Sequence, residues 1–111
     1  MSGSPLASIV YSPADRELYQ RCFDQLRAGC EHPKPDFLPA AAVVKVMRES
    51  GVEREKLQKI WQLCCSSKEE VAAGEFFAVL RLLLVAQKGL PFSMASINQT
   101  AGLPRAGFGV W

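Results

Sequence analysis

Hydrophobic residues recur every three or four positions in four separate stretches of this sequence, a spacing that places them on one face of an α-helix. Glycine and proline residues, which commonly mark helix ends, lie between the stretches. We therefore predict four helices, over about residues 13–28, 39–50, 53–65 and 73–88. The last of these is apolar on nearly every side, which indicates that it is the most buried.

The ends of these helices carry recognisable signals. Ser12 precedes Pro13, and an acidic residue follows in the first turn, a combination that favours a helix start. Gly51 and Gly89 follow the second and fourth helices, where glycine supplies the left-handed backbone that ends a helix.

The four helices group into two helix-loop-helix units, so the fold class is all-α. Each loop within a unit carries an apolar residue shortly before the next helix, Leu38 in the first and Val71 in the second. In paired EF-hands the two loops meet at such residues through a short strand contact. A plain four-helix bundle has the same periodicity, so the pattern alone leaves both architectures open.

Composition is that of a soluble globule. The 111 residues are 49% hydrophobic and 22% charged, enough for one domain with one core. A dispersed net charge of +2 argues against a nucleic-acid partner. The most apolar run, 76–86, is interrupted by Arg81 and is shorter than the roughly 20 residues that cross a bilayer, so no membrane insertion is expected. Without a secretory signal pattern, the chain is predicted to be cytoplasmic.

Cysteine and histidine do not form a recognisable chemical site. Cys64 and Cys65 are adjacent, and Cys30 lies close only to the single histidine, His32, which is not the spacing of a structural zinc site. We expect free thiols, no metal and no cofactor. His32 has no nucleophilic partner in register, so we predict that the protein is not an enzyme.

The run 57–63, Leu-Gln-Lys-Ile-Trp-Gln-Leu, resembles the L-x-x-I-W-x-L motif on the third helix of EH domains. Residues 74–79 resemble the start of that family's fourth helix, and 89–91 resemble its Gly/Pro-rich exit. The likeness covers about residues 13–97. The domain organisation implied is an N-terminal extension over 1–11, an EH-like paired EF-hand over 12–97 and an irregular C-terminal tail over 98–111.

The resemblance implies a calcium-independent module that binds short Asn-Pro-Phe motifs in partner proteins of endocytosis and vesicle traffic. It implies a monomeric domain of a larger protein, brought to vesicles by its partners. The family's pocket lies between the second and third helices. Carried over by position, its lining is Val43, Val44, Met47, Val52, Leu57 and Trp61. Arg54 stands where the family has an apolar residue; it is expected to narrow the pocket or to favour acidic residues beside the motif.

Both inter-helix loops lack the oxygen ligands of a calcium site. In the first loop Pro33 and Pro35 occupy ligand positions, and Ala42 stands at the twelfth. The second loop, 65–75, is one residue short and has no central glycine. We therefore expect the loops to persist as scaffold only.

Two alternatives remain open at this stage. Residues at helical spacing pack a core as readily as they line a pocket, and Ile60 is assigned to the core. The competing function is an S100-like dimerisation module without a peptide pocket, which uses the apolar face of the fourth helix: Phe76, Phe77, Leu80, Leu83 and Leu84. The tail is either a linker or a segment whose Phe108 or Trp111 docks into an apolar groove.

Overall fold

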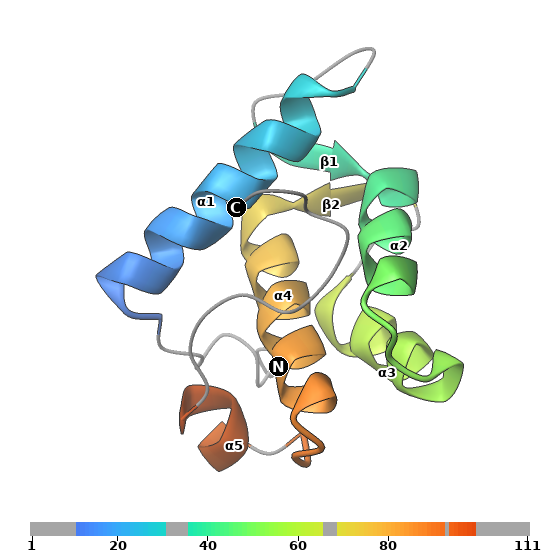
Figure 1. Ribbon diagram of the computed structural model, residues 1–111. Coiled ribbons are helices and arrows are strands. Elements are labelled where there is room, and N and C mark those ends of the chain that lie inside the picture. The colour runs from blue at the N-terminus through green and yellow to red at the C-terminus, as the bar shows by residue number, and fades with distance from the viewer. Residues whose placement is uncertain (1–10, 31–35, 66–68, 93, 100–111) are drawn as a thin grey trace, which may run out of the picture.

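The computed structural model describes residues 11–30, 36–65, 69–92 and 94–99. Helix α4 runs through the middle of the molecule, with α1 on one side and α2 and α3 on the other (Figure 1). No helix within the described ranges has the length and apolarity needed to span a bilayer. The elements are α1 (Pro13–Ala28), β1 (Phe37–Pro39), α2 (Ala40–Glu49), α3 (Arg54–Cys64), β2 (Glu70–Ala72), α4 (Ala73–Gln87) and α5 (Met94–Gln99).

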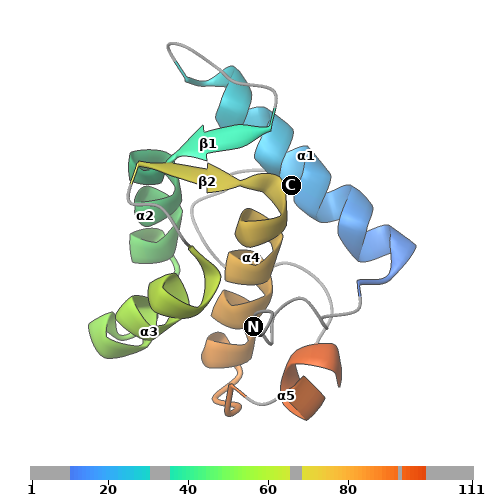
Figure 2. The ribbon, with the colours of Figure 1, turned by 180° about the vertical axis from the view of Figure 1, so that it is seen from behind.

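The two strands pair where the sequence predicted a contact between the loops. Strands β1 and β2 are antiparallel, and Leu38 lies opposite Val71 in the register. Both side chains are fully buried, because they face the core beneath this two-stranded sheet. The sheet crosses the end of the molecule at which α2 and α4 begin (Figure 2). This pairing distinguishes the paired EF-hand from a plain bundle and confirms the predicted fold class.

The helix ends follow the predicted chemistry. Ser12 caps α1, since its hydroxyl oxygen accepts a hydrogen bond of 3.1 Å from the Asp15 amide. Gly51 and Gly89 adopt φ angles of 75° and 72°, a region in which other residues are strained. Helix α4 starts differently: its Glu75 carboxylate accepts a 3.0 Å hydrogen bond from the Ala72 amide.

Helix α4 is the centre of the core, as its all-round apolarity predicted. Four of the five side chains proposed above for a dimer interface are buried within the single chain: Phe76, Leu80, Leu83 and Leu84. Phe77 is half-buried and packs against Tyr11 and Tyr19. The surface that the dimer hypothesis requires is therefore already covered by other parts of the same chain.

Arg81 lies within this apolar helix and is only 1% exposed. Its guanidinium donates to the Asp15 carboxylate at 2.9 Å, to the Tyr19 hydroxyl at 3.1 Å and to the Ile97 carbonyl oxygen at 2.8 Å. These partners lie on α1 and α5, so one side chain joins three helices. The guanidinium carbon also lies 5.2 Å from the centre of the Tyr11 ring.

The boundaries of the folded part are wider than the sequence indicated. Tyr11, assigned to an N-terminal extension, packs against Tyr19 with ring centres 5.7 Å apart. Asn98, assigned to an irregular tail, lies in α5, a short helix that the periodicity did not predict. The side chain of Ile97 anchors α5 to the core, with 2% exposure.

Candidate functional site

A groove of about 530 Å³ opens on the surface between α2 and α3. Helix α2 packs mainly against the two strands and α3 mainly against α4, so the two helices diverge. The groove occupies the space between them. Its lining residues are Val44, Met47, Arg48, Val52, Arg54, Leu57, Gln58 and Trp61.

Helical spacing explains why these side chains share one surface. On α2 the lining residues lie at positions i, i+3 and i+4, starting from Val44. On α3 they lie at i, i+3, i+4 and i+7, starting from Arg54 and ending at Trp61. Val52 lies in the turn between the helices. The two rows therefore face one another across the groove.

The apolar residues form the base of the groove and the polar residues its margins. Met47 is 4% exposed and belongs to the core, so it closes the groove from below. Leu57 and Trp61 are half-buried and pack against the core on one side. Arg48 and Gln58 are exposed. An apolar floor with a polar margin is the usual arrangement of a site for a small ligand or peptide side chain.

Six of the seven residues expected in a pocket line this groove. Val43 does not: its side chain is fully buried in the core, one helical position away from Val44. We therefore leave Val43 out of the site. Ile60 is fully buried, in agreement with its assignment to the core.

Two lining residues were missed by the sequence reading. Arg48 lies four residues after Val44, and Gln58 lies three residues before Trp61. Helical spacing from those two neighbours was the available signal. The expected lining was carried over by position from the family's pocket, so it did not include these two polar residues.

The turn that carries Val52 is held by specific hydrogen bonds. The Ser50 hydroxyl donates to the Met47 carbonyl oxygen and accepts from the Val52 amide at 3.3 Å. From α4, the Gln87 amide donates to the Ser50 carbonyl oxygen at 2.7 Å. The central helix therefore fixes the edge of the groove.

The cysteines do not line this groove, and burial raises the pKa of three of their thiols. Within the described ranges, no three His, Cys, Asp or Glu residues group as potential metal ligands. Ala42 lies in α2, whereas Pro33, Pro35, His32, Phe108 and Trp111 lie outside the described residues. Burial raises the pKa of Cys22 to about 11 and that of Cys65 to about 12, and it raises the pKa of Cys64 further. These thiols are therefore protonated at neutral pH and weakly nucleophilic.

Comparison with known proteins agrees with this geometry. The family model of the EH domain matches residues 11–104, most of the chain. Human epidermal growth factor receptor substrate 15 is 27% identical over 106 residues, which are 95% of this chain. The match covers 11% of that protein, so the chain spans a small part of its relative. No solved structure matches the chain significantly.

Proposed function

This chain belongs to the EH-domain family, and on that premise we propose that its α2–α3 groove binds short Asn-Pro-Phe-type motifs in partner proteins. EH domains are protein-interaction modules and not enzymes. The observation that carries the proposal is the half-buried Trp61, whose ring lines an open groove with an apolar floor. A tryptophan that only filled the core would not line a solvent-accessible groove.

The chemistry of the groove suits such a motif. An Asn-Pro-Phe turn is partly ordered by its proline, which lowers the entropy cost of binding. Its phenylalanine needs an apolar slot, which Met47, Leu57 and Trp61 provide together. Its asparagine needs hydrogen-bonding partners, and Gln58 and Trp61, whose side chains carry an amide and an indole N–H, both line the groove. A ligand this small is expected to bind with on the order of 4–8 kcal/mol, a millimolar to micromolar Kd.

We also propose that binding is independent of calcium, because neither inter-helix loop has the oxygen ligands of a calcium site and neither loop lines the groove. None of its lining residues belongs to the first loop, 31–42, or to the second, 65–75. Peptide affinity should therefore be the same in excess calcium and in excess chelator. The likeness to human epidermal growth factor receptor substrate 15 supports the proposal that the partners act in endocytosis. We propose that the chain is a monomeric module of a larger cytoplasmic protein.

The dimerisation hypothesis is disfavoured by burial. It needs the apolar face of α4 on the surface, but Phe76, Leu80 and Leu83 are fully buried in one chain. A size measurement tests this directly, because a monomer near 12.2 kDa is expected across the micromolar range.

The decisive experiment is an amide chemical-shift titration with an Asn-Pro-Phe peptide, using two matched leucine variants. Leu57→Ala removes a side chain from the groove, whereas Leu63→Ala removes an exposed leucine of the same helix that does not line it. We expect Leu57→Ala to weaken binding by about 10-fold and Leu63→Ala to leave it unchanged. Far-ultraviolet circular dichroism checks that both variants are folded. Absence of saturable shifts at millimolar peptide, or equal losses in both variants, would overturn the proposal.

A further inference from the structure

A second groove lies on the other side of Val52. It measures about 600 Å³ and includes residues of the α2–α3 turn, the first turn of α3 and the end of α4. Val52 lines both grooves, so they meet at this residue. The lining of the second groove is Ser50, Gly51, Val52, Glu53, Lys56, Leu84, Ala86, Gln87 and Lys88.

The second groove differs from the first in chemistry. Its lining includes two lysines, Lys56 and Lys88, and one carboxylate, Glu53. Together with Arg48 and Arg54 of the first groove, the joined surface carries four basic residues and one acidic residue. The whole chain has 13 basic and 11 acidic residues, so positive charge is concentrated on this surface.

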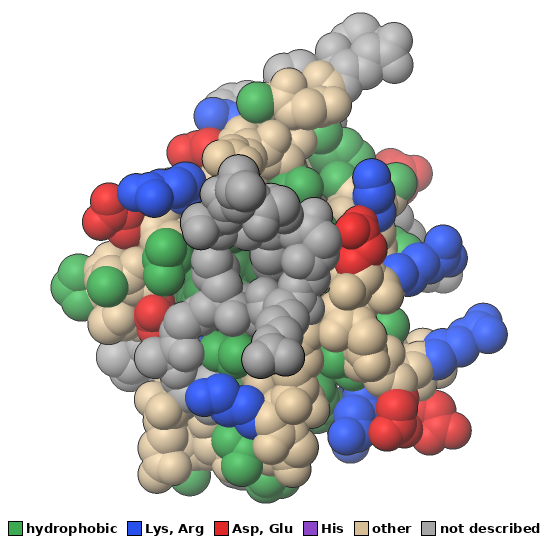
Figure 3. Space-filling view, viewed as in Figure 1, with side chains coloured by type: hydrophobic (Ala, Val, Ile, Leu, Met, Phe, Trp, Pro, Cys, Tyr) green, Lys and Arg blue, Asp and Glu red, His purple; other side chains and the backbone are tan. Residues whose placement is uncertain are grey.

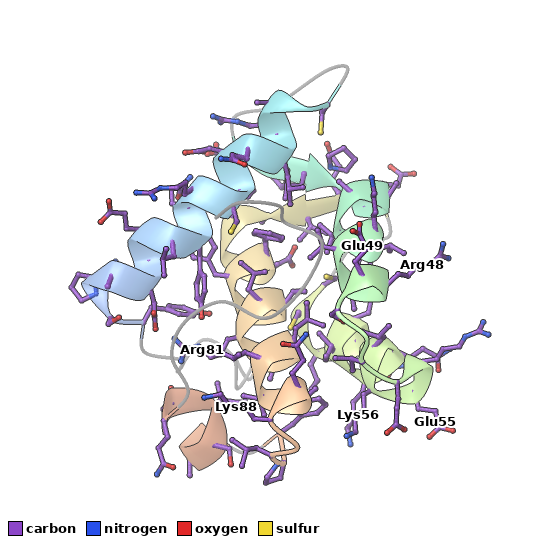
Figure 4. All side chains as sticks on the ribbon, viewed as in Figure 1. Arg48, Glu49, Glu55, Lys56, Arg81 and Lys88 are labelled. Carbon is purple, nitrogen blue, oxygen red and sulfur yellow. The ribbon has the colours of Figure 1, made fainter. Side chains whose placement is uncertain are left out.

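The pictures agree with this distribution. Basic side chains project from the flank formed by α2 and α3, with some acidic ones among them (Figure 3). Arg48 extends from α2 and Lys56 from the first turn of α3, on the same side of α4 (Figure 4). Lys88 directly follows α4 and extends toward α5 in this view, and it lines the second groove at the end of α4. In the described part of the chain, none of these three residues forms an ion pair.

The start of α3 separates the two grooves and adds to the positive electrostatic potential of the surface that they share. Arg54 lines one groove and Lys56 the other, on opposite sides of the first turn. No side chain among the described residues caps this turn, so its amides contribute the positive end of the helix dipole. Glu55, also in the first turn, is exposed and lines neither groove.

We propose that the second groove receives an acidic flank of the same peptide whose apolar motif occupies the first groove. The flank crosses Val52, and its carboxylates lie near Lys56 and Lys88. The inference rests on the proposed function and extends it, because it names the residues that a preferred partner carries beside the motif. Charge complementarity supports this occupant. The surface offers cations that form no ion pair with the described residues, and a peptide bound in the first groove delivers carboxylates at high local concentration.

The test compares peptides that share one Asn-Pro-Phe motif and differ only in flanks: neutral on both sides, three glutamates before the motif, or three after it. Isothermal titration calorimetry at low salt gives each Kd. We expect one of the two acidic peptides to bind more tightly than the neutral one, by roughly 3- to 10-fold. The gain is no larger because exposed ion pairs are individually weak. High salt should remove most of that advantage.

Two double variants then locate the effect. Lys56→Gln with Lys88→Gln removes the lysines of the second groove and should abolish the acidic advantage without changing neutral-peptide affinity. Lys45→Gln with Lys59→Gln removes the same charge from exposed positions of α2 and α3 that line neither groove, and should preserve the advantage.

The outcomes separate the two proposals. Neutral peptide that binds without any acidic advantage overturns the inference and leaves the proposed function intact. An advantage that both double variants reduce equally also overturns it, because the effect is then general to net charge. If no peptide binds, the proposed function fails first. Tighter binding of anionic lipid vesicles than of acidic peptide, lost only in Lys56→Gln with Lys88→Gln, would replace the peptide with a membrane as the occupant.

Discussion

Replacing Asp15 with Asn tests the buried network that joins α1, α4 and α5. The substitution keeps the shape of the side chain but removes the negative charge that faces the Arg81 guanidinium at 2.9 Å. The Arg81 side chain is 1% exposed and that of Asp15 is 7% exposed, so water cannot replace the lost partner. Removing one member of a buried ion pair typically costs about 3–5 kcal/mol, because an uncompensated charge stays buried.

The expected loss for Asp15→Asn lies near the lower end of that range, about 3 kcal/mol. The Asn carbonyl oxygen can still accept one hydrogen bond, and Arg81 keeps its bonds to the Tyr19 hydroxyl and the Ile97 carbonyl oxygen. A domain of this size has a free energy of unfolding of about 5–15 kcal/mol, so the loss is a large part of the total. It corresponds to a fall in Tm of roughly 10–20 °C.

Urea unfolding followed by circular dichroism measures the loss, and Glu17→Gln is the matched control. Glu17 lies on the same helix and pairs with Arg21 at 3.4 Å, but its side chain is 73% exposed, so the same change of charge should cost little. Arg81→Met completes a double-mutant cycle with Asp15→Asn. The double variant should be more stable than the sum of the single losses predicts. A loss below about 1 kcal/mol for Asp15→Asn, or strict additivity, would refute the role assigned to this pair.

Three further changes have defined outcomes. Gln87→Ala removes the 2.7 Å bond to the Ser50 carbonyl oxygen and should weaken peptide binding several-fold while the helix content is unchanged, as calorimetry and circular dichroism report. Gly51→Ala places a Cβ at a φ of 75° and should cost about 1 kcal/mol in urea unfolding, although no atom lies within 4 Å of the new methyl group. Burial raises the pKa of Tyr11 from 10.0 to about 12 and that of Cys65 from 9.0 to about 12. As the pH rises, the unfolded chain therefore loses these protons before the folded chain does, which favours unfolding. In thermal melts, stability should be constant below pH 9 and fall between pH 9 and 12. A flat profile through pH 12 would contradict the assigned burial.

Local patterns were sufficient for the four long helices, and they indicated a strand contact between the loops without excluding a plain bundle. Apolar periodicity, the Ser12 cap and the glycine stop at Gly51 act within a few residues, so they can be read without knowledge of the fold. Leu38 and Val71 were identified because each is an apolar residue in a polar loop at the same place in its unit. In all these cases the chemical cause lies within one or two turns of the residue itself.

The division of an apolar face between core and groove could not be read in this way. Val43 and Val44 are adjacent and chemically identical, yet Val43 is fully buried and Val44 lines the groove. Which of them faces the core depends on the rotation of α2, and that rotation is set by its packing against the strands. Periodicity gives the direction of an apolar stripe but not the position of its edge, where the groove begins.

The Arg81 network was missed for a different reason. Asp15 was interpreted as an acidic residue that favours a helix start, and Arg81 as an interruption in an apolar run. Both local explanations are reasonable, but the two residues are 66 positions apart and only the fold brings them together. Helix α5 was missed for the same reason, because its six residues are held by Arg81 and by burial of Ile97 rather than by their own periodicity.

Helix α4 separates the part of the molecule that maintains the fold from the part that we propose recognises peptides. Arg81 lies on the α1 side of α4, whereas Arg48, Glu55 and Lys56 lie on the α2–α3 side (Figure 4). The link from α4 to the recognition side is Gln87, which holds the turn between the two grooves. A substitution at Asp15 should therefore lower stability without changing the Kd of the remaining folded protein, whereas Gln87→Ala should change the Kd more than the stability. If both substitutions changed the two quantities in proportion, α4 would transmit strain between its sides, and the separation argued here would be wrong.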